Sequence, residues 1–519
     1  MRTSPMLLAA LAATLTATLA AGAAHARPRQ LTASSGDTYV ARRAPNGRGP
    51  LALVSDGDLT PGAPGNADGS RETFTLDVRT GALRQLSASD RSTTPARVGA
   101  AGDVVLVGTG DLTPGAPGNA DRSVETWFFD AAEGRLEQAT ATASDTFFQA
   151  YFDGGRRAFF VSKGDLTPGA PGNADGRNEV FTLARDTGEF RQLTNTPQES
   201  LVRALDPLGR FALVQSRGDL TPGAPGNADA SCELYLLDLA TLALHQVTAS
   251  TGDSVFADWS ADGRHVAFTS TGDLTGDNAD GSREVFVLEL PGEELRQLTA
   301  SAADSDFASF GPRAHLVGIH ARGDLVAGGD GDGSQEVFLA DLRDGSLAQL
   351  TRSAGDSTLV GIAPRRRFAA IVSRGDLAPG APGNADGSEE LYLVRLRGRE
   401  RRVVQATDGD AAVLFAGFDR AGRYAALSTR GDPVPSLNAD GSSEAFAVRV
   451  RSRPRVLQLT ESDADTFAGP FLRSGRRLLL ESRADLARTG PGNADGSLEV
   501  FVAPVRRVRR PKVLDLFTR

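Results

Sequence analysis

The chain has 519 residues, a formal net charge of −9 at pH 7 and a sequence pI near 5.3. This acidic balance argues against nucleic acid as a partner, because affinity for nucleic acid depends on Lys and Arg side chains that neutralise phosphates. With 58 Gly, 27 Pro and 23% charged residues, the chain is expected to contain many turns and few long amphipathic helices, which favours an all-β fold.

Residues 1–26 match the pattern of an export signal. A single Arg2 precedes an apolar run from Met6 to Ala21, and the small residues Ala24-His25-Ala26 form the expected cleavage pattern. No later stretch approaches the roughly 18 consecutive apolar residues of a membrane span. We therefore predict a periplasmic or secreted protein whose mature chain begins near residue 27. Cys232 is the only cysteine, so no intrachain disulfide supports the fold.

A repeat of 51 to 55 residues occupies the predicted mature chain, 27–519. The segment GDLTPGAPGNADGSRE at Gly57 returns with few changes at Gly110, Gly164 and Gly218. Self-similarity at such a period is typical of solenoids and propellers. Nine copies can be aligned, with approximate bounds 37–88, 89–142, 143–196, 197–250, 251–300, 301–352, 353–408, 409–461 and 462–519.

The fifth copy shows most clearly what one repeat contains. Val255 to Ser260 and His265 to Thr269 read as strands joined by a tight turn. Glu284 to Leu290 and Arg296 to Thr299 read as a second hairpin. Four short strands separated by turn residues are typical of a propeller blade. We predict a single β-propeller of about nine four-stranded blades, since no linker interrupts the periodicity as two rings would require.

Two terminal segments are candidates for completing the ninth blade. Residues 28–34 contain the stretch RQLT, and Lys512 to Phe517 (KVLDLF) follows the last third strand. We favour the N-terminal segment, because it matches the RQLT consensus at the fourth strand of the other blades.

Whole repeat units resemble those of a known family. Units such as FADWSADGRHVAFTS followed by EVFVLELPGEELRQLTAS resemble the TolB-type, WD-repeat-like propeller repeat of exported bacterial proteins. The resemblance covers nearly all of the mature chain and implies a β-propeller fold. TolB itself carries six blades and an extra N-terminal α/β domain, so the resemblance does not imply its partner or role for this chain.

Antiparallel blades fix which segments share a face of the ring. The loop between the second and third strands lies with the blade-to-blade link on one face, here called the loop face. Both hairpin turns lie on the opposite face, the turn face. Acidic loops and links fall on the loop face, including Asp145, Asp253, Asp356 and Asp465. Arg-rich turns fall on the turn face, including Arg365 to Arg367 and Arg397 to Arg402. We predict a disc that is acidic on one face and basic on the other.

Three acids and one amide or acid recur in the loop of every copy. The Asp of the GDL triplet, or its equivalent, recurs as Asp58, Asp111, Asp165, Asp219, Asp273, Asp324, Asp376, Asp432 and Asp485. An Asn, replaced by Asp in the sixth copy, recurs as Asn66, Asn119, Asn173, Asn227, Asn278, Asp330, Asn384, Asn438 and Asn493. A second Asp recurs two residues later as Asp68, Asp121, Asp175, Asp229, Asp280, Asp332, Asp386, Asp440 and Asp495. The Glu that opens the third strand recurs as Glu72, Glu125, Glu179, Glu233, Glu284, Glu336, Glu390, Glu444 and Glu499.

Two interpretations of these loops stay open. The pattern Asn-x-Asp-Gly-x-x-Glu resembles part of the oxygen-rich loops that hold Ca²⁺, so all of these residues are candidate calcium ligands. Asp330 to Glu336 is the closest copy, although Pro64 stands where the first copy would need its first acid. In the competing interpretation, which we prefer, Asn and Asp cap turns and Glu binds orphan backbone amides, giving a metal-free staple. Identical loops argue against an active site, because catalysis needs different groups that converge.

An aromatic residue also recurs two positions after each Glu. A sugar-binding platform is conceivable, but strand alternation favours packing between blades. These residues are Phe74, Trp127, Phe181, Tyr235, Phe286, Phe338, Tyr392, Phe446 and Phe501.

Signals for an enzyme are weak. Gly252-Asp253-Ser254 resembles the GDS block of certain lipases, but those enzymes need a late histidine and the last one here is His320. No G-x-S-x-G elbow is present. The histidines of the mature chain lack the spacing of metal ligands; they are His245, His265, His315 and His320.

We therefore predict an exported, non-catalytic propeller that binds a protein or cell-envelope partner through its acidic loop face, with Ca²⁺ as the candidate cofactor. The alternative is a calcium-dependent hydrolase or lyase with its site in the central channel. In that case one blade should carry residues that its siblings lack. Copies six to eight depart most from the consensus, at His315, His320 and Arg365 to Arg367.

Overall fold

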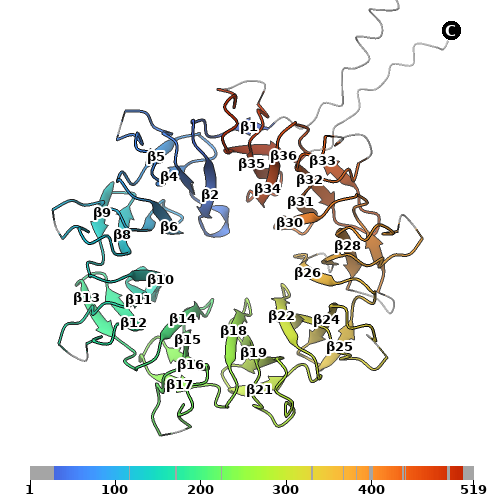
Figure 1. The fold of residues 1–519 in the computed structure, drawn as a ribbon, viewed down its shortest axis with the longest axis horizontal. Helices are drawn as coiled ribbons and strands as arrows, with labels where there is room; N and C mark the ends of the chain where they lie inside the picture. Colours follow the sequence, from blue (N-terminus) through green and yellow to red (C-terminus); the bar gives the residue numbers. More distant parts are fainter. Residues whose placement is uncertain are drawn as a thin grey trace, which may run out of the picture.

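The nine repeats fold into nine blades around a central opening (Figure 1). The structure is a computed structural model that describes residues 28–505 except 63, 116, 170–171, 224, 329–330, 366–367, 381–382, 397–400, 435–437, 439 and 488–490. Each blade is a four-stranded antiparallel sheet. Two short 3-10 helices, η1 (Pro45–Gly47) and η2 (Asp153–Gly155), are the only helices in the described chain. The predicted all-β propeller of nine blades is confirmed.

Each blade contributes one strand to each of four concentric positions. The innermost strands are β2 (Thr38–Arg43), β6 (Thr93–Val98), β10 (Thr146–Phe152), β14 (Ser200–Leu205), β18 (Ser254–Trp259), β22 (Ser305–Phe310), β26 (Ser357–Ile362), β30 (Val413–Phe418) and β34 (Thr466–Phe471). The second strands are β3 (Leu51–Ser55), β7 (Val104–Gly108), β11 (Arg157–Ser162), β15 (Phe211–Ser216), β19 (His265–Ser270), β23 (Leu316–Ala321), β27 (Phe368–Ser373), β31 (Tyr424–Thr429) and β35 (Arg477–Ser482). The third strands are β4 (Glu72–Leu76), β8 (Glu125–Asp130), β12 (Glu179–Ala184), β16 (Glu233–Asp238), β20 (Glu284–Glu289), β24 (Glu336–Asp341), β28 (Glu390–Arg395), β32 (Glu444–Arg449) and β36 (Glu499–Pro504). The fourth strands are β5 (Leu83–Gln85), β9 (Arg135–Gln138), β13 (Glu189–Gln192), β17 (Leu244–Gln246), β21 (Glu294–Gln297), β25 (Ser346–Gln349), β29 (Val403–Gln405), β33 (Val456–Gln458) and β1 (Arg29–Gln30).

The N-terminal strand β1 is the fourth strand of the ninth blade. Gln30 lies opposite Phe501 of β36, and the Leu31 N–H donates to the Val500 carbonyl at 2.8 Å. Hydrogen bonds between the two ends of the chain therefore close the ring. The other candidate for this strand, 512–517, lies outside the described residues.

The hydrophobic core lies between neighbouring blades. Phe74 of β4, for example, packs with Leu479 of β35 and Val500 of β36, which belong to the ninth blade. All nine aromatic residues that follow the strand-opening Glu are fully buried. The prediction that they pack between blades is confirmed, and none of them is available as a sugar platform.

The strand order separates loops and links from hairpin turns. Acidic loops therefore lie on one face and the Arg-rich turns on the other, as the antiparallel pattern predicts. The turns of other blades carry acids such as Asp103, Asp153 and Asp206, so the turn face is mixed in charge rather than basic throughout. Residues 366–367 and 397–400, predicted on the turn face, lie outside the described residues. The described arginines in the turns of blades seven to nine are Arg365, Arg401, Arg402, Arg420, Arg423, Arg451, Arg453, Arg455, Arg473 and Arg476. Within 28–505, leaving out the gaps given above, we find no helix with the length and apolarity that crossing a membrane requires.

Candidate functional site

The Glu that opens each third strand is buried and accepts hydrogen bonds from its own blade and from the link to the next blade. In the first blade, Glu72 Oε1 accepts the backbone N–H of Ser89 at 2.7 Å and the Ser70 hydroxyl at 3.0 Å. Its Oε2 accepts the hydroxyls of Ser87 and Thr93. A single carboxylate thereby connects the loop, the end of the fourth strand and the link to the next blade.

The backbone contact of this carboxylate recurs in all nine blades. Each Glu accepts one link N–H at 2.5 to 2.8 Å. In the ninth blade the donor is Ser34, which follows β1, so ring closure uses the same contact. These are the contacts of a metal-free staple. The donor residues are Ser89, Thr142, Thr196, Ser250, Ser301, Ser353, Gly409, Ser462 and Ser34.

The loop Asn and the second Asp cap the turn before the third strand. Asn66 Nδ2 donates to the Ser70 carbonyl at 2.7 Å, and Asp68 Oδ1 accepts the Ser70 N–H at 2.9 Å. All nine second Asp residues accept the equivalent N–H at 2.9 to 3.1 Å. The Asn is buried in every described loop, whereas the second Asp is always exposed. Asp330, predicted at the Asn position of the sixth copy, lies outside the described residues.

A glutamine that the sequence analysis did not single out holds the middle of the loop. Gln85, at the end of β5, accepts the Gly65 N–H at 3.2 Å and donates to the Gly65 carbonyl at 3.0 Å. At the start of the loop, Asp58 Oδ1 accepts the Thr60 N–H at 3.1 Å. The same glutamine contacts recur at Gln138 and Gln246. The recurrence of a Gln at the end of the fourth strand, in RQL or a variant of it, was the sequence signal for this role.

The two copies that replace the loop glycine keep its backbone conformation. Gly69 has φ of 72°, and Arg122 and Ala230 at the equivalent positions have φ of 64° and 59°. Residues with a Cβ rarely adopt this left-handed region, so the surrounding hydrogen bonds impose it.

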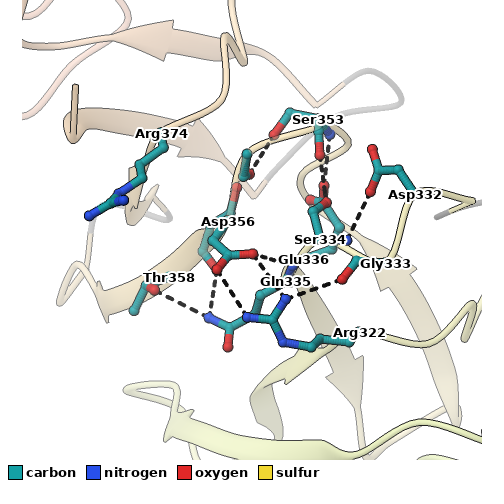
Figure 2. A network of polar contacts seen from close by, with 12 residues as sticks. Arg322, Asp332, Gly333, Ser334, Gln335, Glu336, Ser353, Asp356, Thr358 and Arg374 are labelled. Atoms are coloured by element: carbon teal, nitrogen blue, oxygen red, sulfur yellow. Dashed lines mark hydrogen bonds and ion pairs between the residues drawn. The ribbon is translucent and has the colours of Figure 1, made fainter. Parts of the chain in front are cut away.

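Link acids bind the preceding blade. Figure 2 shows Asp356, which accepts the Gln335 N–H at 2.8 Å and pairs with Arg322 at 2.9 Å. The hydrogen bond from Arg322 holds the pKa of Asp356 below its ordinary value. Ion pairs of the same kind, at 2.6 to 2.7 Å, neutralise part of the negative charge on the loop face; they are Arg217–Asp253, Arg430–Asp465 and Arg483–Asp37.

Burial and hydrogen bonding shift the pKa values of the loop acids in opposite directions. Burial raises the pKa of Glu72 against its hydrogen bonds, and it raises the pKa of Glu179 to about 7. The backbone N–H of Ser70 lowers the pKa of Asp68, and Asp121 and Asp229 shift downward for the same reason. Hydrogen bonding therefore favours the charged form of Asp68, Asp121 and Asp229, whereas burial disfavours the charged form of Glu72 and Glu179.

The candidate calcium ligands make other contacts with part of their oxygens. One oxygen of each strand-opening Glu accepts a link N–H. The Oδ1 atom of each second Asp accepts a backbone N–H. Among the residues that the structure describes, no group of three or more His, Cys, Asp or Glu is arranged to hold a metal ion. The contacts of these Asp, Asn and Glu side chains therefore fit the staple better than a calcium-binding loop.

Unusual side chains near the central opening connect neighbouring blades. His320 Nε2 accepts the Leu359 N–H of the next blade at 2.9 Å. Glu481 Oε1 accepts the Val40 N–H of the first blade at 2.8 Å. His315 precedes β23 on the turn face, whereas His320 lies near the loop end of the same strand. The two late histidines therefore do not share a site.

Exposed apolar side chains recur at one position of the innermost strands. Phe147, Val255, Leu414 and Phe467 are each the second residue of their strand and are 37 to 58% exposed. We call these four residues the apolar collar. Because the innermost strands follow the links directly, the collar lies at the loop-face end of the central opening.

No family model matches the chain, and no curated protein matches it. Solved structures with a similar fold include TolB from Acinetobacter baumannii, at 13% identity, covering 71% of this chain and 78% of that one, with a TM-score of 0.27. An oligogalacturonate lyase from Vibrio parahaemolyticus matches at 14% identity over 73% of this chain and 96% of that one, with a TM-score of 0.32. A lyase of this kind has also been solved with manganese.

A prolyl endopeptidase matches at 12% identity over 75% of this chain, with a TM-score of 0.37. The match covers 51% of that protein, so this chain corresponds to about half of its length. The structural neighbours thus include TolB and other β-propeller proteins, and at these identities the likeness concerns the fold alone.

Proposed function

We propose that the chain is an exported binding module whose loop face docks a protein or cell-envelope partner. The observation that carries the proposal is the combination of two features on one face. The apolar collar borders the central opening, and the nine exposed capping Asp residues belong to the surrounding loops. An apolar centre within a charged rim is the common anatomy of a protein interface.

The loops support a binding role because their own hydrogen bonds fix their shape. A surface that is ordered before binding loses less conformational freedom when a partner docks. The recurring groups are the same in every blade, so they suit recognition of an extended surface better than catalysis at one point. A partner that complements this face would present apolar side chains flanked by Lys or Arg.

Selection from a random peptide library on the immobilised protein tests this proposal. We expect the selected peptides to combine basic and apolar residues. Leu414→Ser and Phe467→Ser together should weaken their binding by about tenfold or more, since each removes apolar contact area. Leu208→Ser is the matched control, because Leu208 is 61% exposed but lies in a hairpin turn on the turn face.

Retention of binding by the collar variant would contradict the proposal, as would selected peptides without net positive charge. Turnover of oligosaccharides, phosphate esters or peptides by the protein would favour the alternative, a hydrolase or lyase with its site in the central channel. Calcium binding by the loops stays a separate proposal, supported by the residue types of the loop and opposed by the contacts that these residues already make.

A further inference from the structure

Three grooves of the described chain are lined by residues in or next to the hairpin turns, and so lie on the turn face. Their volumes are about 320, 960 and 1420 Å³. The largest, here called the seam groove, runs along the turns of blades eight, nine, one and two. It exceeds the roughly 300–1,000 Å³ of most small-molecule sites, so it suits an extended ligand.

The seam groove lies where the ring is closed. In the other blades a hairpin turn joins the third strand to the fourth. In the ninth blade β36 ends at Pro504, and its partner β1 comes from the other end of the chain. Pro504 and Val505 line the groove at the place where the other blades have a turn.

Arginine dominates the lining of the seam groove. Asp77 is the one acid in this lining, and its carboxylate accepts the backbone N–H groups of Arg79 and Thr80. Arg423 pairs with Asp419 at 3.2 Å. The arginines of the lining are Arg43, Arg79, Arg84, Arg423, Arg473, Arg476 and Arg477.

Six of the seven arginines form no ion pair with a described residue, and all six are exposed. They are Arg43, Arg79, Arg84, Arg473, Arg476 and Arg477. Unpaired guanidinium groups in a concave surface favour an anion that they can bind in bidentate fashion. The sequence that follows Val505 begins RRVRRPK, so its charge does not complement the groove.

The rest of the lining indicates the class of anion. Apolar surfaces of Pro50, Leu83 and Leu472 lie among the guanidinium groups, and they suit the C–H faces of sugar rings better than an inorganic phosphate chain. Phe471 is buried and Tyr424 half-buried, so the lining lacks the exposed aromatic platform on which single-stranded nucleic acids stack. We propose that the seam groove binds an acidic oligosaccharide, with carboxylates on Arg473, Arg476 and Arg477.

Calorimetric titration with a uronic acid hexamer tests the proposal. The protein should bind the hexamer and not maltohexaose, a neutral hexamer, and binding should weaken as salt is raised. Arg476→Ala with Arg477→Ala should weaken binding by about tenfold or more, because each substitution removes a charge-assisted contact. Arg264→Ala is the matched control: Arg264 precedes β19 as Arg476 precedes β35, but it lies outside the groove.

Equal loss of affinity in the control variant would overturn the proposal, as would equal binding of maltohexaose or no binding of the uronate. Tighter binding of polyphosphate, an acidic peptide or single-stranded DNA would overturn the assignment of the ligand. All variants change exposed side chains, so unchanged melting temperatures are expected and confirm that folding is intact. The proposal concerns the turn face and stands or fails independently of the peptide selection on the loop face.

Discussion

At the scale of single residues, the repeated loop assigns each of its polar groups a different environment. Glu72 is buried, Asn66 is buried and Asp68 is exposed, and this order is kept wherever the loop is described. The buried carboxylate loses hydration but gains N–H and O–H donors, so its removal is expected to leave those donors without partners. The exposed Asp can be changed to Asn without loss of its capping role, because the amide oxygen accepts the same N–H.

Substitution of Glu179 provides a test of the buried carboxylate. Its folded-state pKa is raised to about 7 by burial, so the folded protein holds this proton more tightly than the unfolded chain does. The wild type should therefore lose stability relative to Glu179→Gln as the pH rises from about 4.5 to about 7, by about 2–3 kcal/mol. Denaturant unfolding of both proteins at pH 4.5 and 7.5 measures this difference.

Glu189→Gln is the control for this measurement, because Glu189 is exposed in the fourth strand of the same blade. Its stability relative to the wild type should show little change over the same pH range. A difference between wild type and Glu179→Gln that is the same at both pH values would mean that burial does not shift this carboxyl group.

At the scale of elements, the two-residue strand β1 completes the ninth blade and closes the ring. The two residues of β1 and the donors that follow it complete the ninth blade, where Thr32 and Ser34 bind the buried Glu499. Without them, the ninth blade would keep three strands and expose the edge of β36. The carboxylate of Glu499 would also lose Thr32 and Ser34 as donors and keep only the Ser497 hydroxyl among its described donors, which is costly for a buried carboxylate.

Removal of residues 27–34 from the mature protein should therefore lower the free energy of unfolding by several kcal/mol. The single change Thr32→Val, which deletes one donor to Glu499, should cost about 1–3 kcal/mol. Thermal melting or denaturant unfolding measures both. Removal of residues 506–519 serves as the comparison, since the described ninth blade is complete without them. A larger loss from that C-terminal truncation would contradict closure by β1.

At the scale of the whole molecule, one ring places nine copies of the same loop on one face. The other face carries nine turns between first and second strands and eight turns between third and fourth strands, because β1 completes the ninth blade. Any contribution of a single loop is therefore multiplied by nine, whereas the seam occurs once in the ring. The loop face offers repeated acids around an apolar collar, and the turn face offers the arginine-lined seam groove. The loop face and the seam groove therefore suit ligands of opposite charge.

Because the loop occurs nine times, calcium binding by the loops would be easy to detect by thermal melting. At about 5 mM Ca²⁺, sites with dissociation constants of roughly 10⁻⁴–10⁻³ M would each add about 1–2 kcal/mol, so nine of them would raise the melting temperature by many degrees. Because the loop carboxylates already bind N–H and O–H donors, we expect the melting temperature in excess chelator and in 5 mM Ca²⁺ to agree within about 1 °C. A rise of several degrees would favour calcium-loaded loops.

The sequence by itself determined the number of blades, their four strands and the face on which each loop lies. Those properties follow from a local period and from antiparallel pairing, both of which can be counted along the chain. The burial of the nine aromatic residues followed from strand alternation in the same way. The hydrogen bonds of the loop Asn, Asp and Glu were also foreseeable, because these side chains commonly accept backbone N–H groups near a turn. Calcium binding by the same loops stays a separate proposal.

Only the tertiary structure decided which groups that are far apart in the sequence come into contact. The donors to each Glu lie in the next link, the link acids pair with arginines of the preceding blade, and the last Glu finds its donor at the other end of the chain. The seam groove likewise joins turns that lie more than 400 residues apart in the sequence. Periodicity describes neighbours within a repeat, whereas these contacts depend on how the ring closes.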